Sequence, residues 1–464
     1  MADLTLTSDQ QAAIDGILRD IKEPGARVVL CGYAGTGKTV TTAALVGELR
    51  AKGMNVAVAT PTHKAKVQVE KALRARGARG FLCVTLHAML GLKPRIDYKT
   101  GSVEFLPDYG SDNMLARKSP KEYFNYKTGQ TEERHPIDIV IVDETSMVNR
   151  FLYDLLLGEL DDRPVVFVGD DRQLLPVKED KVCPAFVEAR SIYKLDDVLR
   201  HDGAILHLAT ETRRLPVGRA CFRGCSSGGS QVVAYQRRQQ WMDALLGEMR
   251  KPEAMDNPDF CRALAWINKD VQTLNKAIHI ARYGKNSPRF LAGMTCVTVD
   301  AIPDPIGGRP LLNSTMDVLV LSAEEEYFTA PYDETIGVEH WKTWTLEVEA
   351  CGLPGRIEIR VIHENEIERW KESQKFFADK AKTCADSAEK KSWWDMYWKR
   401  SDQFGRLEPA SALTIHKSQG STFQNVFLHW DIDGWGSAPT AQQNQLAYVG
   451  ITRAAESLHV VADR

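Results

Sequence analysis

One stretch decides the fold: Gly32-Tyr33-Ala34-Gly35-Thr36-Gly37-Lys38-Thr39, which reads G-x-x-x-x-G-K-[ST]. The apolar run 28–31 before it predicts a buried strand, and 41–50 after it has apolar residues at helical spacing. Glycines let backbone N–H groups approach phosphate oxygens, and the following helix directs its positive dipole end at the same anion. The alternative is a glycine turn that contains Lys-Thr by chance, but the flanking strand and helix favour a phosphate-binding loop.

The chemistry of such a loop assigns roles to its last residues. Lys38 would bridge the β- and γ-phosphates, and Thr39 would hold Mg²⁺. The backbone of Gly35, Thr36 and Gly37 would line the phosphates. The expected ligands are therefore ATP and Mg²⁺.

Composition limits the class of protein. A chain of 464 residues is too long for one core, and its 43% hydrophobic and 26% charged residues are typical of a globular protein. The net charge of -3 means that nucleic-acid contacts must come from local patches. The sequence has no apolar run of the length that a membrane span needs, so no membrane span is expected. Residues 1–5 lack the charged and apolar regions of a secretory signal, so none is expected. The nine cysteines are scattered along the chain, which is typical of reduced thiols in a cytoplasmic protein. Cys221 and Cys225 could begin a zinc site, but no second pair of Cys or His residues follows at the spacing of a zinc finger.

The order of predicted elements indicates parallel sheets. Further apolar strands are expected at 56–60, 137–142 and 165–168, with a helix at 65–76, so we expect a parallel sheet that is covered on both faces. A second α/β unit begins near Lys194, has a strand at 262–268 and resumes from 413 to the end.

Two segments break this alternation. The polar stretch 91–135 is expected to be an insertion with a hairpin formed by 95–98 and 103–106. The second break has strands at 318–321, 345–348 and 357–362, then a charged helical stretch at 364–399. The Gly- and Arg-rich stretch 212–240 is predicted to be a mobile loop.

Acidic and amide side chains follow two of the predicted strands. Asp143 would bind Mg²⁺ and Glu144 would polarise the attacking water, because phosphoryl transfer needs both beside the phosphate loop. Gln173, after the next strand, would contact the γ-phosphate or that water. The alternative for Asp143 and Glu144 is a solvated acidic turn after a strand, and the alternative for Gln173 is a loop residue without a catalytic role.

These motifs, with 413–421 and 448–453, occur in the order found in helicases, and the chain resembles the Dda/RecD-like branch of the superfamily 1 DNA helicases. The resemblance implies an α/β fold with two tandem RecA-like P-loop domains. It also implies an inserted β-hairpin pin and an inserted small β-barrel, SH3-like, domain. The implied boundaries are 1–90 with 135–190 for motor 1A, 91–134 for pin 1B, 191–300 with 406–464 for motor 2A, and 301–405 for domain 2B.

The resemblance implies further nucleotide contacts. Gln10 would read the adenine edge, although from the residues alone it is a polar residue at a helix start. Arg200 and Arg453 would be arginine fingers from the second motor, the alternative for each being a surface ion pair. Gly420 would belong to the nucleotide-binding set.

The resemblance also implies a set of DNA contacts that follow the strands of both motors. Hydroxyl, imidazole and amide groups suit phosphates, and aromatic rings suit bases, whereas Trp266 could equally be a core residue. Phe105 would be the aromatic residue at the tip of the pin, the alternative being packing on its own domain. The full set is Thr62, His63, Thr85, His87, Phe105, Trp266, Asn268, Thr414, His416 and Lys417.

The implied activity is an ATP-dependent helicase that moves 5′ to 3′ on single-stranded DNA and opens junctions with duplex DNA. Candidate protein partners are single-strand-binding and replication proteins, with roles in DNA replication, repair and recombination. One alternative is a translocase that strips bound proteins without separating strands. Another is a P-loop binding protein that switches conformation with its nucleotide.

Overall fold

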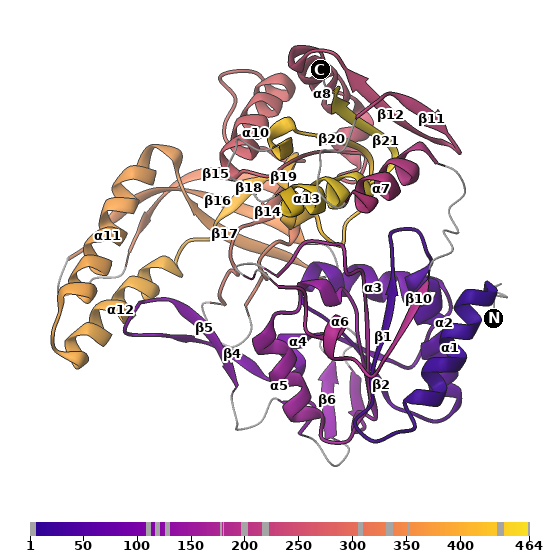
Figure 1. Ribbon diagram of the computed structural model, residues 1–464. Helices are drawn as coiled ribbons and strands as arrows, with labels where there is room; N and C mark the ends of the chain where they lie inside the picture. The colour runs from indigo at the N-terminus through magenta and orange to yellow at the C-terminus, as the bar shows by residue number, and fades with distance from the viewer. Residues whose placement is uncertain are drawn as a thin grey trace.

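The computed structural model describes residues 6–107, 113–116, 121–125, 130–176, 179, 181–195, 203–215, 222–304, 310–330, 337–350, 353, 355–433 and 440–462. Two α/β lobes lie one above the other, and an antiparallel sheet with a helical arm extends to one side (Figure 1). The chain starts in the lower lobe and ends in the upper lobe. None of the described helices is long and apolar enough to cross a membrane.

The lower lobe is built on six parallel strands. Their order across the sheet is β10 (Ser191–Leu195), β1 (Arg27–Gly32), β9 (Val165–Gly169), β8 (Ile139–Val142), β2 (Val56–Thr60) and β3 (Leu82–Thr85). One face packs against α1 (Ser8–Asp20), α2 (Lys38–Ala51) and α3 (His63–Ala75). The other packs against α4 (Leu86–Met89) and α5 (Arg150–Leu160). The predicted two-sided parallel sheet is therefore confirmed, and Val/Ile-rich strands buried on both faces are its cause.

The upper lobe repeats this plan with one antiparallel edge. Its strand order is β11 (Cys225–Ser227), β12 (Ser230–Tyr235), β21 (Ala454–Val461), β20 (Phe423–Leu428), β13 (Cys261–Ala265) and β19 (Ala412–Thr414), and only the β11–β12 pair is antiparallel. The helices that pack on it are α7 (Ala204–Arg214), α8 (Arg238–Met249), α10 (Asn268–Tyr283) and α13 (Thr440–Thr452), and the short α9 (Pro252–Asp256) follows α8.

Two predictions for this lobe are wrong. The stretch 212–240 is not one mobile loop, because α7 extends to Arg214, β11 and β12 form a hairpin and α8 starts at Arg238. Parallel pairing of β12 with β21 gives the hairpin its place in the sheet. The strand predicted at 262–268 ends at Ala265, because the N–H groups of Trp266 and Ile267 bind the Asp431 carboxylate and α10 begins at Asn268.

The third sheet is antiparallel and has its own core. Its order is β17 (Arg356–Ile362), β16 (His340–Ala350), β15 (Asp317–Thr329), β14 (Thr295–Thr298) and β18 (Leu407–Pro409). In the described residues, no strand pairing joins β17 to β18. The charged helical stretch predicted at 364–399 forms two helices, α11 (Ile367–Thr383) and α12 (Ser387–Ser401). Asp386 starts the second one by accepting the Glu389 N–H at 2.8 Å.

The insertion contains the predicted hairpin, with strands β4 (Leu92–Ile96) and β5 (Val103–Pro107). The first strand lies earlier than the predicted 95–98, because the turn begins at residue 97. Its turn rests on α12: Tyr98 donates to Asp395 at 2.8 Å, and Trp398 Nε1 donates to the Gly101 carbonyl at 3.2 Å. Gly101 has φ of +76°, and a Cβ added there would lie 2.1 Å from the Trp394 ring. A second hairpin, β6 (Lys121–Asn125) with β7 (Gln130–Arg134), follows.

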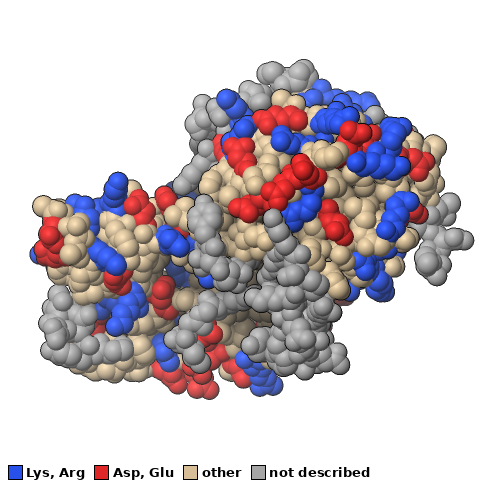
Figure 2. All heavy atoms as spheres, turned by 90° about the horizontal axis from the view of Figure 1, so that it is seen from below, with Lys and Arg blue, Asp and Glu red and all other residues tan. Residues whose placement is uncertain are grey.

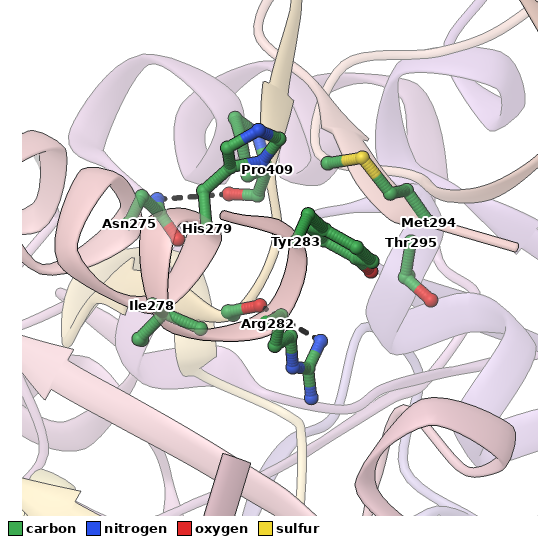
Figure 3. Close-up of a pocket in the computed structure, with 9 residues that line it drawn as sticks. Asn275, Ile278, His279, Arg282, Tyr283, Met294, Thr295 and Pro409 are labelled. Atoms are coloured by element: carbon green, nitrogen blue, oxygen red, sulfur yellow. Dashed lines mark hydrogen bonds between the residues drawn. The ribbon is translucent and has the colours of Figure 1, made fainter. Parts of the chain in front are cut away.

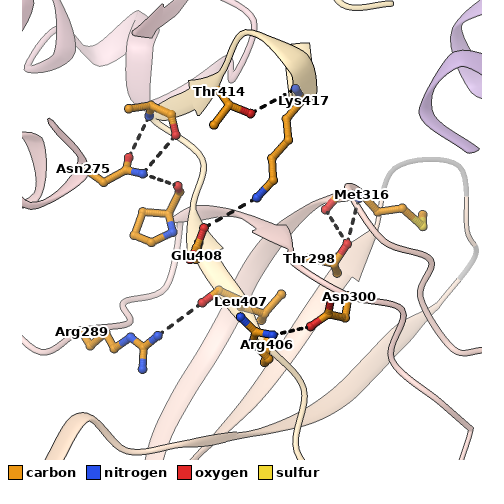
Figure 4. A network of polar contacts seen from close by, with 12 residues as sticks. Asn275, Arg289, Thr298, Asp300, Met316, Arg406, Leu407, Glu408, Thr414 and Lys417 are labelled. Atoms are coloured by element: carbon orange, nitrogen blue, oxygen red, sulfur yellow. Dashed lines mark hydrogen bonds and ion pairs between the residues drawn. The ribbon is translucent and has the colours of Figure 1, made fainter. Parts of the chain in front are cut away.

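Polar contacts connect the upper lobe to the third sheet (Figure 4). Asn275 of α10 donates to the carbonyls of Pro409 and Ala412 at 2.9 and 3.0 Å. The ammonium of Lys417 lies 3.8 Å from the Glu408 carboxylate. A shallow pocket at this junction is lined by α10 residues with Met294, Thr295 and Pro409 (Figure 3). It lies away from the phosphate-binding loop, so we assign no nucleotide to it.

Two helical glycines give a matched test of packing in the lower lobe. A Cβ on Gly16 of α1 would lie 2.2 Å from the Tyr193 ring, whereas a Cβ on Gly47 of α2 meets nothing within 4 Å. We expect Gly16→Ala to lower the free energy of unfolding by about 1–3 kcal/mol through overpacking. Gly47→Ala should raise it by about 0.5–1 kcal/mol, because alanine favours helix. Denaturant titration of both variants measures this difference, and equal effects would contradict the packing described.

Candidate nucleotide-binding cleft and nucleic-acid surface

The loop between β1 and α2 has the backbone that the glycines predict. Gly35 and Gly37 have φ of +86° and +84°, in the left-handed region that only glycine adopts readily. A Cβ on Gly32 would lie 2.5 Å from Thr36 Oγ1. The loop is thus closed on itself at the N-terminus of α2, where N–H groups bind anions.

Lys38 lies over this loop. Its Nζ donates to the carbonyls of Gly32 and Tyr33 at 2.6 and 2.9 Å. An ammonium with carbonyl partners alone is available to exchange them for phosphate oxygens, which bind it more strongly. Thr39 lies in the first turn of α2 and is half-buried.

Gln10 supports the loop from α1. Its amide oxygen accepts from the Thr7 N–H, and its amide nitrogen donates to the Thr36 carbonyl, both at 3.2 Å. The side chain is buried and forms a capping box with Thr7. It therefore has the helix-start role expected from the residues alone, while adenine recognition stays a prediction.

The acidic pair lies at the carboxyl end of β8. Burial, and then repulsion by Glu144, raises the pKa of Asp143 to about 7. The Glu144 N–H donates to Asp143 Oδ1 at 2.8 Å, and Glu144 has φ of +53°, which is strained for a residue with a side chain. A buried carboxyl group beside the phosphate-binding loop fits a Mg²⁺ site, because a divalent cation would stabilise its charged form.

A hydrogen-bonded bridge joins the two lobes at this site. Tyr448 of α13 donates to the Asp170 carboxylate at 2.6 Å, and its hydroxyl accepts from the Ala34 N–H of the loop at 3.1 Å. Asp170 follows β9 and is fully buried, and burial raises its pKa. Gln173, in the same segment, lies 3.4 Å from the Ser146 hydroxyl, which follows Glu144.

Two arginines of the upper lobe lie near the cleft. Arg453 is buried and donates to the carbonyls of Val449 and Ser421 at 3.1 and 3.0 Å. Burial lowers its pKa, and the charges of Glu144 and Asp170 in the lower lobe oppose this shift. The Arg213 guanidinium stacks on the Tyr33 ring, 3.1 Å from its centroid. Arg200 lies outside the described residues.

Gly420 lies at the contact between the lobes. A Cβ added to it would meet Ala65 and Gln68 of α3 at 3.8–3.9 Å. These neighbours belong to α3 and not to the phosphate-binding loop, so its assignment to the nucleotide stays a prediction.

Predicted DNA contacts of the lower lobe lie together at the carboxyl ends of β2 and β3, which are paired in parallel. Thr62 and Thr85 cap α3 and α4, and each hydroxyl accepts a backbone N–H at 3.2 Å while retaining its own proton. His63 is the first residue of α3. Burial lowers the pKa of His87, which makes its imidazole a neutral hydrogen-bond donor.

The upper lobe has the same arrangement at the ends of β13 and β19, which are also paired in parallel. Trp266 is half-buried beside the core, and Asn268 is exposed at the first position of α10. Thr414 accepts the Lys417 N–H at 3.2 Å, and burial lowers the pKa of His416.

The structure corrects the position of Phe105. This residue is not at the hairpin tip, since it pairs with Pro94 in the middle of the ladder and the turn spans 97–102. Its side chain is 46% exposed, and its ring meets His87 edge-on with centroids 5.1 Å apart. It therefore lies next to the predicted DNA contacts of the lower lobe.

Sequence reasoning missed Tyr448 and Arg213. Tyr448 lies in the motif 448–453, and its hydroxyl is the one polar side-chain group in the otherwise apolar run Leu446–Ile451. A buried hydroxyl in such a run indicates a specific hydrogen-bond partner. Arg213 has no comparable signal, because its partner Tyr33 is far away in the sequence.

Comparisons with known proteins agree with these motifs. An AAA domain family model matches residues 5–220, and a UvrD-like helicase C-terminal domain model matches 409–461. The ATP-dependent DNA helicase dda of Enterobacteria phage T4 is 26% identical, with 97% of each chain covered. The RecBCD enzyme subunit RecD of Haemophilus influenzae is 21% identical over 96% of this chain and 67% of its own.

A crystal structure of a Bacteroides Pif1 helicase with ADP-AlF3 and ssDNA aligns with a TM-score of 0.49 at 17% identity, covering 99% of this chain and 93% of that chain. The motifs, their order along the chain and the full-length similarity to the phage helicase point to one family. The chain belongs to the superfamily 1 helicases.

Proposed function

We propose that this protein is an ATP-dependent DNA helicase, in which ATP hydrolysis between the two lobes drives movement along single-stranded DNA. The bridge from Tyr448 to Ala34 and Asp170 carries the proposal, because it connects the phosphate-binding loop to the opposite lobe. A nucleotide that enters this cleft alters contacts that both lobes share.

The residues of the lower lobe suit ATP binding and hydrolysis. Lys38 can exchange two carbonyls for phosphate oxygens, and Asp143 with Thr39 would hold Mg²⁺. When bound, Mg²⁺ neutralises charge that develops on the phosphate oxygens. Glu144 would orient and polarise the attacking water, and Gln173 lies within reach of Ser146 in the neighbouring segment.

The upper lobe supplies cations to the same cleft. Arg453 directly follows the last residue of α13, Thr452, so the tyrosine bridge positions the helix end from which this arginine extends. A cation stabilises phosphoryl transfer only when it is held at the site of developing charge. We therefore propose Arg453 as an arginine finger, and Arg213 as a second cation at the loop. Arg200 keeps its proposed role by resemblance.

Single-stranded DNA would lie across the carboxyl ends of both sheets. The lower lobe offers the hydroxyls of Thr62 and Thr85 and a neutral histidine there, and the upper lobe offers Thr414 and a neutral histidine. These groups suit contact with phosphates without reading base sequence. On the face in Figure 2, described basic and acidic side chains are mixed without a large area of one sign. Local contacts of this kind therefore carry binding, and closure of the lobes would move one set relative to the other.

The inserted elements support strand separation as well as translocation. We propose that the β4–β5 hairpin is the pin of domain 1B (91–134). We also propose that the third sheet is the SH3-like domain 2B, whose α12 supports the pin. The predicted range 301–405 is too short for this sheet, because β14 and β18 lie just outside it. The contacts of Tyr98 and Gly101 with α12 favour this role over that of a translocase that only strips proteins. Movement from 5′ to 3′ is proposed from the similarity to the phage helicase, and tailed duplexes of each polarity test it.

Lys38→Ala should reduce ATP hydrolysis at least about 100-fold, because the transition state loses a positioned cation. The fold should be unchanged, since Lys38 contacts only its own loop. Steady-state hydrolysis with and without single-stranded DNA, together with circular dichroism, measures both. Retained DNA-stimulated turnover in a folded variant would contradict this site.

Tyr448→Phe removes the bridge but keeps the ring. We expect DNA-stimulated kcat to fall about tenfold, because Arg453 is no longer positioned against the lower lobe. Affinity for a fluorescent ADP analogue should change no more than about twofold, since the loop itself is intact. Tyr235→Phe is the matched control, because it removes a 2.9 Å hydrogen bond to His459 within the upper lobe. Parallel losses of nucleotide affinity and kcat would show that Tyr448 only stabilises the loop.

Phe105→Ala and Gly101→Ala should uncouple unwinding from hydrolysis. Each should lower duplex opening by about tenfold while single-strand-stimulated ATPase stays within about twofold. Gly101→Ala displaces the turn from Trp394, whereas the control Gly229→Ala sits in another hairpin turn, with φ of +79° and nothing within 4 Å. Assays use a tailed duplex and matched single strands. Equal loss of both activities would assign Phe105 a merely structural role.

A further inference from the structure

A group of potential metal ligands lies in the upper lobe, among residues to which the nucleotide cleft gives no role. Asp270 is in the first turn of α10, and His429 and Asp431 follow β20. One ligand atom from each lies within 4.8 Å of the other two. Asp431 is fully buried, His429 is buried and Asp270 is half-buried.

The Asp431 carboxylate is held by one oxygen and leaves the other without a partner. Oδ2 accepts from the N–H groups of Trp266 and Ile267 at 2.8 and 2.9 Å. Oδ1 is buried and has no hydrogen-bond partner among the described residues. An unsatisfied buried carboxylate oxygen is costly, so this atom requires a proton donor or a cation.

The nearest polar atom is a histidine nitrogen. Asp431 Oδ1 lies 3.2 Å from His429 Nδ1, which is also placed to accept the Asp431 N–H at 3.2 Å. In the tautomer that accepts this N–H, Nδ1 carries a lone pair that faces the lone pairs of Oδ1, and a cation between them would remove this repulsion. Two ligands at ~2.1 Å from one ion are about 3.0–3.4 Å apart, which matches this separation. One carboxylate oxygen of Asp270 lies within 4.8 Å of both ligand atoms.

In the described part of the chain, no Lys or Arg forms an ion pair with Asp270 or Asp431. The rings of Trp430 and Trp241 cover His429, with centroids 4.0 and 5.9 Å away. The one described cation beside these aromatic rings, Arg238, lies over the Trp430 ring, 4.9 Å from its centroid, and does not pair with the carboxylates. A divalent cation would balance the two carboxylates, and a set of one nitrogen and two oxygen donors suits zinc and manganese.

We propose that Asp270, His429 and Asp431 bind one divalent transition-metal ion, Zn²⁺ or Mn²⁺, at the start of α10. The ion joins the segment after β20 to the first turn of α10. Because Asp431 also binds the backbone of Trp266 and Ile267, the metal stabilises the position of Trp266 and Asn268. Its role is structural, and it is separate from the Mg²⁺ expected with ATP.

Titration of the full chain without nucleotide tests the site, with Mn²⁺ followed by electron paramagnetic resonance and Zn²⁺ by metal analysis after dialysis. The protein should bind one equivalent of Mn²⁺. Asp270→Asn should weaken binding at least about tenfold, since even outer-shell changes cost that much. Asp270→Asn is the decisive variant because Asp270 is half-buried, whereas Asp431→Asn also alters a helix cap.

Two controls separate this site from others. Asp256→Asn, an exposed acid of the same lobe, and Asp143→Asn, in the nucleotide cleft, should both bind Mn²⁺ like the unchanged protein. Bound metal should also slow hydrogen exchange of residues 266–272 in the unchanged protein and not in Asp270→Asn. Failure to bind either metal at millimolar concentration would mean that His429 carries only a proton, and would overturn the proposal. Equal binding by Asp270→Asn would overturn it too.

Discussion

The hydrogen bond between Tyr448 and Asp170 sets the relation between the lobes. Each partner is buried, and the tyrosine hydroxyl also binds the loop that would hold the phosphates. A single oxygen atom thus contacts a strand end, a glycine-rich loop and the opposite lobe. Because burying a carboxylate without a partner is costly, the lobes are held at a defined separation. In the proposed function, chemistry at the loop would therefore reach the upper lobe through this one contact.

The two lobes place their predicted DNA contacts in the same way. In each, two neighbouring parallel strands end side by side. Thr62 and Thr85 cap the turns that follow in the lower lobe, and Thr414 caps the turn after β19 in the upper lobe. These hydroxyls fix the local backbone and keep a proton for an external acceptor. Burial lowers the pKa of the half-buried histidines beside them, so the proposed binding of a polyanion would not depend on a strong positive field. This agrees with a chain whose net charge is -3.

Local patterns predicted most of the fold, since the strands of the lower lobe are continuous Val/Ile runs and the loop motif lies between its strand and helix. The predictions of secondary structure were wrong where the conformation depends on a residue that is distant in the sequence. The Gly- and Arg-rich stretch 212–240 reads as a loop until β21 pairs with it, and 266–268 reads as strand until Asp431 binds its N–H groups. The contacts of Tyr448 and of Gly101 with Trp394 are also long-range, so no sequence window contains both partners.

The hairpin formed by β4 and β5 is attached at both ends. Leu92 at its base belongs to the core of the lower lobe, and its turn is fixed to α12 by Tyr98 and Gly101. Because both ends of the hairpin are held, a force applied at its middle, where Phe105 lies, should bend it less than if only its base were attached. A force generated between the lobes would therefore reach a group in contact with the Phe105 ring with little loss to deformation of the hairpin.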